Sequence, residues 1–216
     1  MNVDFLQLIL TTSSYSAILP LGLGIFKWRS LSFELKILSA YLFLSLLTDI
    51  TTLQLANNLI NNLPLLYVLT VLEFALFSWV YYNIFESFHL KKSVIVIAAL
   101  FFLVFVISLY QNGVSSYATA PRTVESIVFT IYAIIYFNQI LKGNHSFGLE
   151  KDAMFWFNGG LLVYFAGSLL FFSLSSFILE HASLEMQRKL FTTPAILNIV
   201  QKLLFTIAIW VSQRKK

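Results

Sequence analysis

The sequence predicts an all-α polytopic membrane protein that folds as a bundle of seven transmembrane helices. Of its 216 residues, 58% are hydrophobic and only 11% are charged, whereas a soluble domain has about 25% charged residues. The apolar residues form continuous runs of the roughly 20 residues that a spanning helix needs. These runs lack the alternation that is typical of a membrane β-barrel. Because the intervening loops are short, we predict a single transmembrane domain over residues 1–216.

The seven spans follow from the order of apolar runs along the chain. The first is expected to be retained as a spanning helix rather than cleaved, because Asp4 is the only charged residue near its start and a cleaved signal peptide begins with basic residues. The fifth opens with Pro121 and Arg122 and contains Glu125. Proline suits the first helical turn, so Pro121 and Pro194 are both expected there. The predicted spans are Phe5–Phe26, Ile37–Ala56, Leu63–Phe85, Ser93–Tyr110, Ala120–Leu141, Ala153–Leu179 and Thr192–Ser212.

The distribution of lysine and arginine predicts the orientation, because cytoplasmic loops are enriched in these residues. An outer N-terminus and a cytoplasmic C-terminus place ten basic residues inside and three outside, and leave Lys202 within the last span. This arrangement predicts a multi-pass protein of the cell membrane, which is the inner membrane if the source is bacterial. The ten inner residues are Lys27, Arg29, Lys36, Lys91, Lys92, Lys142, Lys151, Arg214, Lys215 and Lys216, and the three outer residues are Arg122, Arg188 and Lys189.

Several ionisable side chains lie within the predicted spans, where they are costly. A lysine at the centre of a membrane costs from about 3 kcal/mol on insertion scales to over roughly 10 kcal/mol in simulations. At about 1.5 Å per residue, Glu73 and Lys202 both lie about 15 Å below the outer surface. The same count places Asp49 at about 10 Å and Glu125 at about 7 Å. We therefore expect Lys202 to pair with Glu73, and Arg122 to satisfy Glu125 locally.

Helical spacing places further polar residues beside these charges. Thr70 precedes Glu73 by three positions, and Asn198 and Gln201 share a helix face with Lys202. The sequence therefore predicts a pocket for a small ligand or an ion in the outer half of the bundle. The alternative is that these groups only fix which helices are neighbours, because polar contacts between membrane helices also stabilise packing. The candidate pocket residues are Lys202, Glu73, Asp49, Glu125, Asn198, Gln201 and Thr70.

The residue types argue against several other classes of protein. The chain has no cysteine, which excludes disulfides and thiolate metal sites. The histidines do not form a metal-binding pair on a helix, so we predict no metal site. No nucleophile stands beside a base, so a membrane enzyme ranks third, after a sensor and a transporter. The basic residues sit in short clusters between spans, a pattern that indicates membrane topology rather than nucleic-acid binding.

The chain shows two resemblances to known groups of proteins. A lysine midway along the seventh helix (Lys202) with a carboxylate on the third (Glu73) resembles the plan of microbial rhodopsins, which implies retinal as a Schiff base on Lys202 with Glu73 as its counter-ion. The third span lacks the family's arginine, and the sixth lacks its proline and aromatic cage. The runs LLYVLTVLEF (Leu65–Phe74) and ILNIVQKLLFTIA (Ile196–Ala208) resemble uncharacterised bacterial seven-helix membrane proteins, and this resemblance implies no cofactor.

These observations together predict a small sensor or receptor-like membrane module. Its partners would be the lipid bilayer, a small ligand from the outer side and a cytoplasmic signalling partner that contacts the basic segments. The first alternative is a transporter of a small solute or ion, which would need polar side chains that continue to the inner side. Only Asn138, Gln139 and Asn158 are candidates for such a path. The second alternative is a retinal-binding protein.

Overall fold

The computed structural model describes residues 3–142 and 148–212, and the regular structure in these ranges is entirely helical. Short 3₁₀ helices, η1 (Trp28–Ser30) and η2 (Leu149–Lys151), precede α3 and α7. The α-helices are α1 (Val3–Tyr15), α2 (Ile18–Phe26), α3 (Phe33–Asn57), α4 (Leu63–Ile84), α5 (Phe88–Asn112), α6 (Thr119–Lys142), α7 (Ala153–His181) and α8 (Leu184–Val211).

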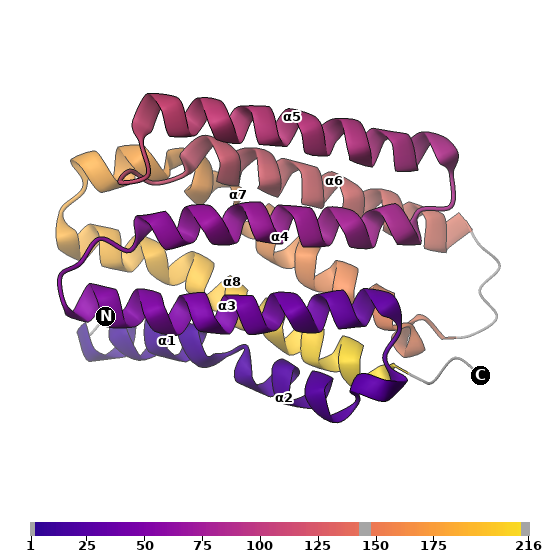
Figure 1. The fold of residues 1–216 in the computed structure, drawn as a ribbon. Coiled ribbons are helices and arrows are strands. Elements are labelled where there is room, and N and C mark those ends of the chain that lie inside the picture. Colours follow the sequence, from indigo (N-terminus) through magenta and orange to yellow (C-terminus); the bar gives the residue numbers. More distant parts are fainter. Residues whose placement is uncertain (1–2, 143–147, 213–216) are drawn as a thin grey trace.

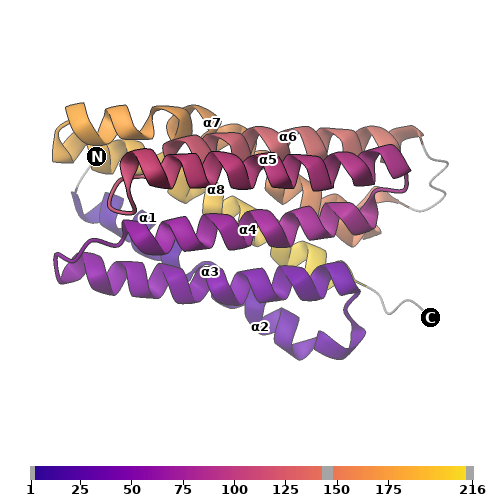
Figure 2. The same cartoon turned by 45° about the horizontal axis from the view of Figure 1, so that its top comes forward.

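The helices run side by side along one axis and form a bundle with two ends (Figure 1, Figure 2). The end that we call the N-terminal end holds the start of α1 and the α3–α4, α5–α6 and α7–α8 turns. The opposite, C-terminal end holds the end of α8 and the α2–α3 and α4–α5 turns. The helices therefore alternate in direction, as expected for a chain that crosses a membrane repeatedly.

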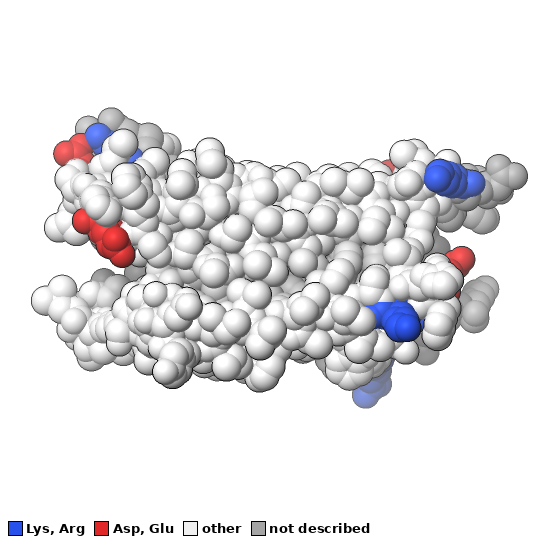
Figure 3. Space-filling view, turned by 90° about the horizontal axis from the view of Figure 1, so that it is seen from above, with Lys and Arg blue, Asp and Glu red and all other residues white. Residues whose placement is uncertain are grey.

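The composition of the helices confirms that this is a multi-pass membrane protein. In the part of the chain that the structure describes, six helical segments are long and apolar enough to span a bilayer. On the face shown in Figure 3, charged side chains gather at the two ends and the band between them is free of charge. The segment predicted as the second span lies in α3, and its crossing stays a prediction. The six segments are Phe5–Phe26, Leu63–Ile84, Phe88–Asn112, Thr119–Lys142, Ala153–His181 and Leu184–Val211.

The first predicted span, Phe5–Phe26, is long and apolar enough to cross a bilayer, but a break divides it into two helices. Helix α1 ends at Tyr15, and α2 begins at Ile18. Pro20 explains the break, because proline has no N–H to donate and its ring clashes with the carbonyl group four residues earlier, here that of Ser16. The helical hydrogen bonds resume where the Leu21 N–H donates to the Ala17 carbonyl, at 3.0 Å.

Three helices begin earlier than hydropathy predicts. Helix α8 begins at Leu184, and Pro194 lies inside the helix instead of in its first turn. In each case a serine occupies the N-cap position, where this residue is favoured, and the polar first turns then extend the apolar run. The corrected starts are Phe33 for α3, Phe88 for α5 and Leu184 for α8, in place of Ile37, Ser93 and Thr192.

The core in the C-terminal half of the bundle is a cluster of aromatic rings from α4, α6, α7 and α8, which we call the aromatic block. Its rings touch across helices: the ring centroids of Phe77 and Phe157 are 5.7 Å apart, and those of Phe157 and Phe205 are 5.6 Å apart. Such contacts add to the stability that comes from area burial alone. The block consists of Phe77, Tyr81, Phe85, Phe129, Tyr132, Phe157, Phe165 and Phe205, each at most 2% exposed.

Candidate functional site

Arg122 on α6 joins two buried carboxylates from different helices. Its Nη1 donates to Oε2 of Glu73 on α4 at 2.7 Å and to Oε2 of Glu125 on its own helix at 3.0 Å. The two glutamates are at most 1% exposed and the arginine is 7% exposed. Arginine suits such a site, because its guanidinium keeps its charge and offers several donors in a fixed geometry.

The surroundings of Arg122 make this an ion pair within protein rather than at a surface. The guanidinium lies over the ring of Phe172 on α7, 5.7 Å from its centroid, which is within the range of a cation–π contact. The backbone N–H of Arg122 bonds to the carbonyl of Ala118, so the first turn of α6 fixes its position. The prediction that Arg122 would satisfy Glu125 is confirmed, but Arg122 does not belong to an outer loop.

Each glutamate also keeps one unused oxygen. The Oε1 atoms of Glu73 and Glu125 are buried and have no hydrogen-bond partner among the described residues. Because one nitrogen of Arg122 serves both carboxylates, the two carboxylates lie close together with a single adjacent cation. A pair of neighbouring carboxylates favours uptake of a proton or a cation by one of them. The arrangement therefore has spare capacity for a positively charged species or a hydrogen-bond donor.

Lys202 has a different partner from the one predicted. Its Nζ donates to the hydroxyl of Tyr41 on α3 at 3.1 Å and lies 4.4 Å from the centroid of the same ring. Among the described residues, no carboxylate comes within the 4.0 Å of an ion pair, so the expected pairing with Glu73 was wrong. The physical reason is that Arg122 already occupies Glu73. Lys202 is 1% exposed, so the groups in contact with its charge are aromatic rings and a hydroxyl.

Asp49 on α3 belongs to the same region. Its side chain is half-buried and accepts a hydrogen bond from Ser45 Oγ at 3.3 Å, one helical turn away. The hydrogen bonds thus place Lys202 on α8 beside Tyr41 on α3, and Glu73 on α4 beside Arg122 and Glu125 on α6. A single pocket that includes Asp49 and all these groups stays a prediction.

Of the remaining candidates, Gln201 is buried without a hydrogen-bond partner among the described residues, whereas Thr70 and Asn198 bond to groups outside the cluster of charges. Both polar atoms of Gln201 are fully buried and have no partner among the described residues. Thr70 donates to the carbonyl of Leu66 on its own helix at 2.7 Å. Asn198 donates to Ser13 Oγ on α1 at 3.0 Å. Gln201 therefore has free polar atoms, whereas Thr70 and Asn198 use theirs in packing contacts.

The sequence-based prediction missed the second partner of Arg122 and the role of Tyr41. It paired Arg122 with Glu125, three residues away, but did not predict the bond from Arg122 to Glu73 on α4. Tyr41 lies in the apolar stretch of α3 and gives no sequence signal, because a tyrosine there is typical of an ordinary core position. Only the packing of α3 against α8 brings its hydroxyl to Lys202.

On α4, α6 and α8 the buried charges lie on the N-terminal side of the aromatic block. Along α4, Glu73 precedes Phe77, and along α8, Lys202 precedes Phe205, with both helices starting at the N-terminal end. Beyond the block, Asn158 accepts from the Tyr81 hydroxyl at 2.7 Å and donates to a backbone carbonyl of its own helix. Of the other polar candidates for a path, Asn138 is exposed and Gln139 is half-buried on the same helix, α6. The rings thus separate the charges from the C-terminal end.

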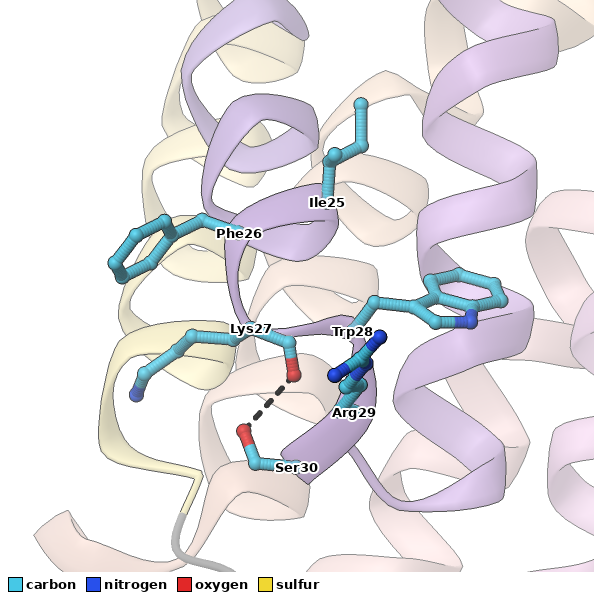
Figure 4. Close-up of a pocket in the computed structure, with 6 residues that line it drawn as sticks. All are labelled: Ile25, Phe26, Lys27, Trp28, Arg29 and Ser30. Atoms are coloured by element: carbon cyan, nitrogen blue, oxygen red, sulfur yellow. Dashed lines mark hydrogen bonds between the residues drawn. The ribbon is translucent and has the colours of Figure 1, made fainter.

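A surface hollow of about 610 Å³ lies far from these charges, at the α2–η1 turn. It is lined by the consecutive residues 25–30 (Figure 4). The Lys27 amine turns away from it and donates to the carbonyls of Ile209 and Trp210 at 3.3 and 2.7 Å. A lysine at the carboxyl end of a helix satisfies free carbonyls and the helix dipole. This hollow is therefore part of a helix cap at the membrane interface.

A scan against family models and searches of characterised proteins and of solved structures found no match to this chain. The retinal resemblance therefore stays a prediction. In the structure, Glu73 bonds to Arg122, and the rings of Tyr41 and Phe205 pack on Lys202.

Proposed function

We propose that this protein is a seven-pass membrane sensor whose buried charges bind a small cation or polar ligand from the outer side. The observation that carries the proposal is the position of the charges. Glu73, Arg122, Glu125, Asp49 and Lys202 gather in one half of the bundle, with buried carboxylate oxygens to spare, and packed rings fill the core of the other half.

The number of spans and the orientation of the chain are both argued from where the charged residues lie on the helices. Helix α3 has 25 residues, about 37 Å at 1.5 Å per residue, and Asp49 is its only charged residue between Ile37 and Ala56. It runs alongside α4 in the opposite direction (Figure 1), which supports its crossing as a seventh span. Since Arg122 is buried, only Arg188 and Lys189 remain on the outer side, and this strengthens the case for an outer N-terminal end.

The separation of the two halves favours a sensor over a transporter. A transporter needs a site that opens alternately to both sides, and its path would have to pass rings that are almost fully buried. A sensor needs only that ligand binding changes the helix packing, because a ligand shifts an equilibrium when it binds one state better. The basic residues at the C-terminal end, such as Lys91 and Lys92, are then available to a cytoplasmic partner.

Cysteine accessibility tests this proposal, because the chain has no native cysteine. In intact cells we expect Asp49→Cys and Thr48→Cys to react with a membrane-impermeant thiol reagent added outside. Ser115→Cys, which is exposed in the α5–α6 turn, is the positive control. Ser78→Cys and Ala133→Cys, which are buried on α4 and α6, should react from neither side.

The same set of variants separates the alternatives. In inside-out vesicles, Asn83→Cys at the C-terminal end should react, because its side chain is exposed, while Asp49→Cys should not. Reaction of Asp49→Cys from both sides would mean an alternating path and would favour the transporter. No reaction of Asp49→Cys or Thr48→Cys from outside would remove the outer pocket from the proposal.

A further inference from the structure

A second cavity, of about 470 Å³, lies where the first span is broken. Residues on both sides of the break form one wall, and α8 forms the other, with Lys202 among its lining residues. Non-helical backbone at membrane depth is tolerated only where it is covered by protein or lines a cavity. The break between α1 and α2 therefore has the cavity that its polar backbone requires.

This cavity opens toward the bilayer and not toward either end of the bundle. Ile18, Leu19 and Leu203 line it and are 52%, 54% and 54% exposed on the outside of the bundle. Lys202 is nine residues from the end of α8 at Val211, which is about 14 Å along the helix axis. That depth is close to the middle of a hydrocarbon core of about 30 Å. A molecule would therefore enter the cavity from the lipid.

The break also supplies hydrogen-bonding groups to this wall. The first N–H groups of a helix have no partner within the helix, and in α2 these include the groups of Ile18 and Leu19, both of which line the cavity. Its N-cap residue, Ala17, makes no side-chain cap bond. Four residues with hydroxyl groups, Thr11, Thr12, Tyr15 and Ser16, line the same cavity, and the Ser16 hydroxyl also donates to the Ser13 carbonyl at 2.6 Å.

Lys202 gives the cavity a preference for negative charge. An ammonium group has three donors, and among the described residues only the Tyr41 hydroxyl accepts from Lys202. No described carboxylate lies within ion-pair distance, although the lysine is 1% exposed. An acidic group that enters from the lipid would supply the missing counter-charge and would bring its own hydrogen-bond acceptors.

We infer that this cavity binds a single-chain amphiphile with a carboxylate head, of the fatty-acid class. The head accepts hydrogen bonds from Lys202 and the hydroxyls at the break, and the chain leaves between Leu19 and Leu203 into the bilayer. This site goes beyond the proposed outer pocket. It shares Lys202 with that pocket and opens on a different face, so either of the two can fail without the other.

The probe is oleate, compared with its methyl ester, on the full chain purified and delipidated in detergent. We expect oleate to raise the melting temperature in a saturable way and methyl oleate to leave it unchanged, because only the acid carries the negative head. A photoactivatable oleate should then label α8 and the residues around the break. Equal effects of acid and ester, or labelling spread evenly over the helices, would overturn the inference.

Two variants locate the site. Leu19→Trp fills the cavity without changing a charge and should weaken oleate binding by about tenfold or more, because the ring takes the space that the ligand needs. Ile196→Trp, on the exposed face of α8 outside the cavity, is the matched control and should bind normally. Lys202→Gln should abolish the difference between acid and ester. Full oleate binding by Leu19→Trp would refute the site even if Lys202→Gln does not fold.

Discussion

Arg122 is the residue on which the buried charges depend most. It is the only cation within ion-pair distance of Glu73 or Glu125 in the described part of the chain. Removing one partner of a fully buried ion pair costs about 3–5 kcal/mol, because the other partner is left as an uncompensated charge. The cost falls where the survivor takes up a proton or meets water.

A double-mutant cycle measures this dependence. Arg122→Gln and Glu73→Gln should each lower stability in detergent, and the double variant should be less damaged than the sum, with a coupling of roughly 0.5–3 kcal/mol. Lys202→Gln combined with Glu73→Gln is the matched control and should show much weaker coupling, because these side chains are not within ion-pair distance. Stronger coupling in the control would restore the pairing that the sequence predicts. Thermal unfolding reads out both cycles.

The true pairing could not be predicted from the sequence, for a physical reason. Equal depth for Glu73 and Lys202 depends on where their helices begin, and α8 begins at Leu184 rather than Thr192. Depth also ignores rotation about the helix axis and the presence of a better partner. By contrast, the convergence of polar faces followed from the cost of charge in lipid, which is independent of such details.

At the scale of elements, α7 and α8 show how a single position sets helix packing. A Cβ atom placed on Gly160 would lie 2.9 Å from the Phe205 ring, whereas one placed on Gly159 meets nothing within 4 Å. Small residues allow membrane helices to approach closely. The ring of Phe205 also stacks on Phe157 within the aromatic block, at a centroid distance of 5.6 Å, so it has little room to move.

These two neighbouring glycines form a matched pair for mutation. Gly160→Ala should destabilise the protein by about 1–3 kcal/mol, the usual cost of overpacking, and Gly159→Ala should be close to neutral. Thermal unfolding in detergent measures both. Similar stability for the two variants would mean that α7 and α8 can separate without cost, in contradiction to the close contact between Gly160 and Phe205.

The elements were predictable to different degrees. Apolar runs identified every long helix, because each helix must present apolar side chains to lipid or core over its whole length. The break after Tyr15 was missed, although Pro20 was the local signal. The early starts of α3, α5 and α8 were missed because serine caps and polar first turns fall outside the apolar window.

At the scale of the whole molecule, the two ends of the bundle differ in charge. The loops at the C-terminal end carry most of the lysine and arginine, whereas Arg188 and Lys189 are the basic residues of the α7–α8 region at the other end. The positive-inside rule therefore predicts that the C-terminal end faces the cytoplasm. If α3 does not cross the membrane, the number of crossings is even and the two termini lie on the same side. A test of the orientation therefore also tests whether α3 crosses.

Reporter fusions test both features. A reporter that is active only in the cytoplasm should be active after Lys216 and silent when inserted in residues 58–62. Insertion in residues 85–87, at the α4–α5 turn, should be active and serves as an internal control on the same side as the C-terminus. Reporter activity at residues 58–62 would mean that α3 and α4 cross the membrane in the opposite direction. The buried charges would then lie in the inner half.

The bond between Glu73 and Arg122 also has a consequence for how the chain is assembled. Helix α4 is synthesised before α6, so its carboxylate enters the bilayer before its cation exists. Until α6 arrives, Glu73 lacks this cation, whereas Arg122 and Glu125 reach the membrane together as a pair with no net charge. The salt bridge thus links the order of synthesis to assembly, because the buried carboxylate of α4 gains its cation only when α6 packs against α4.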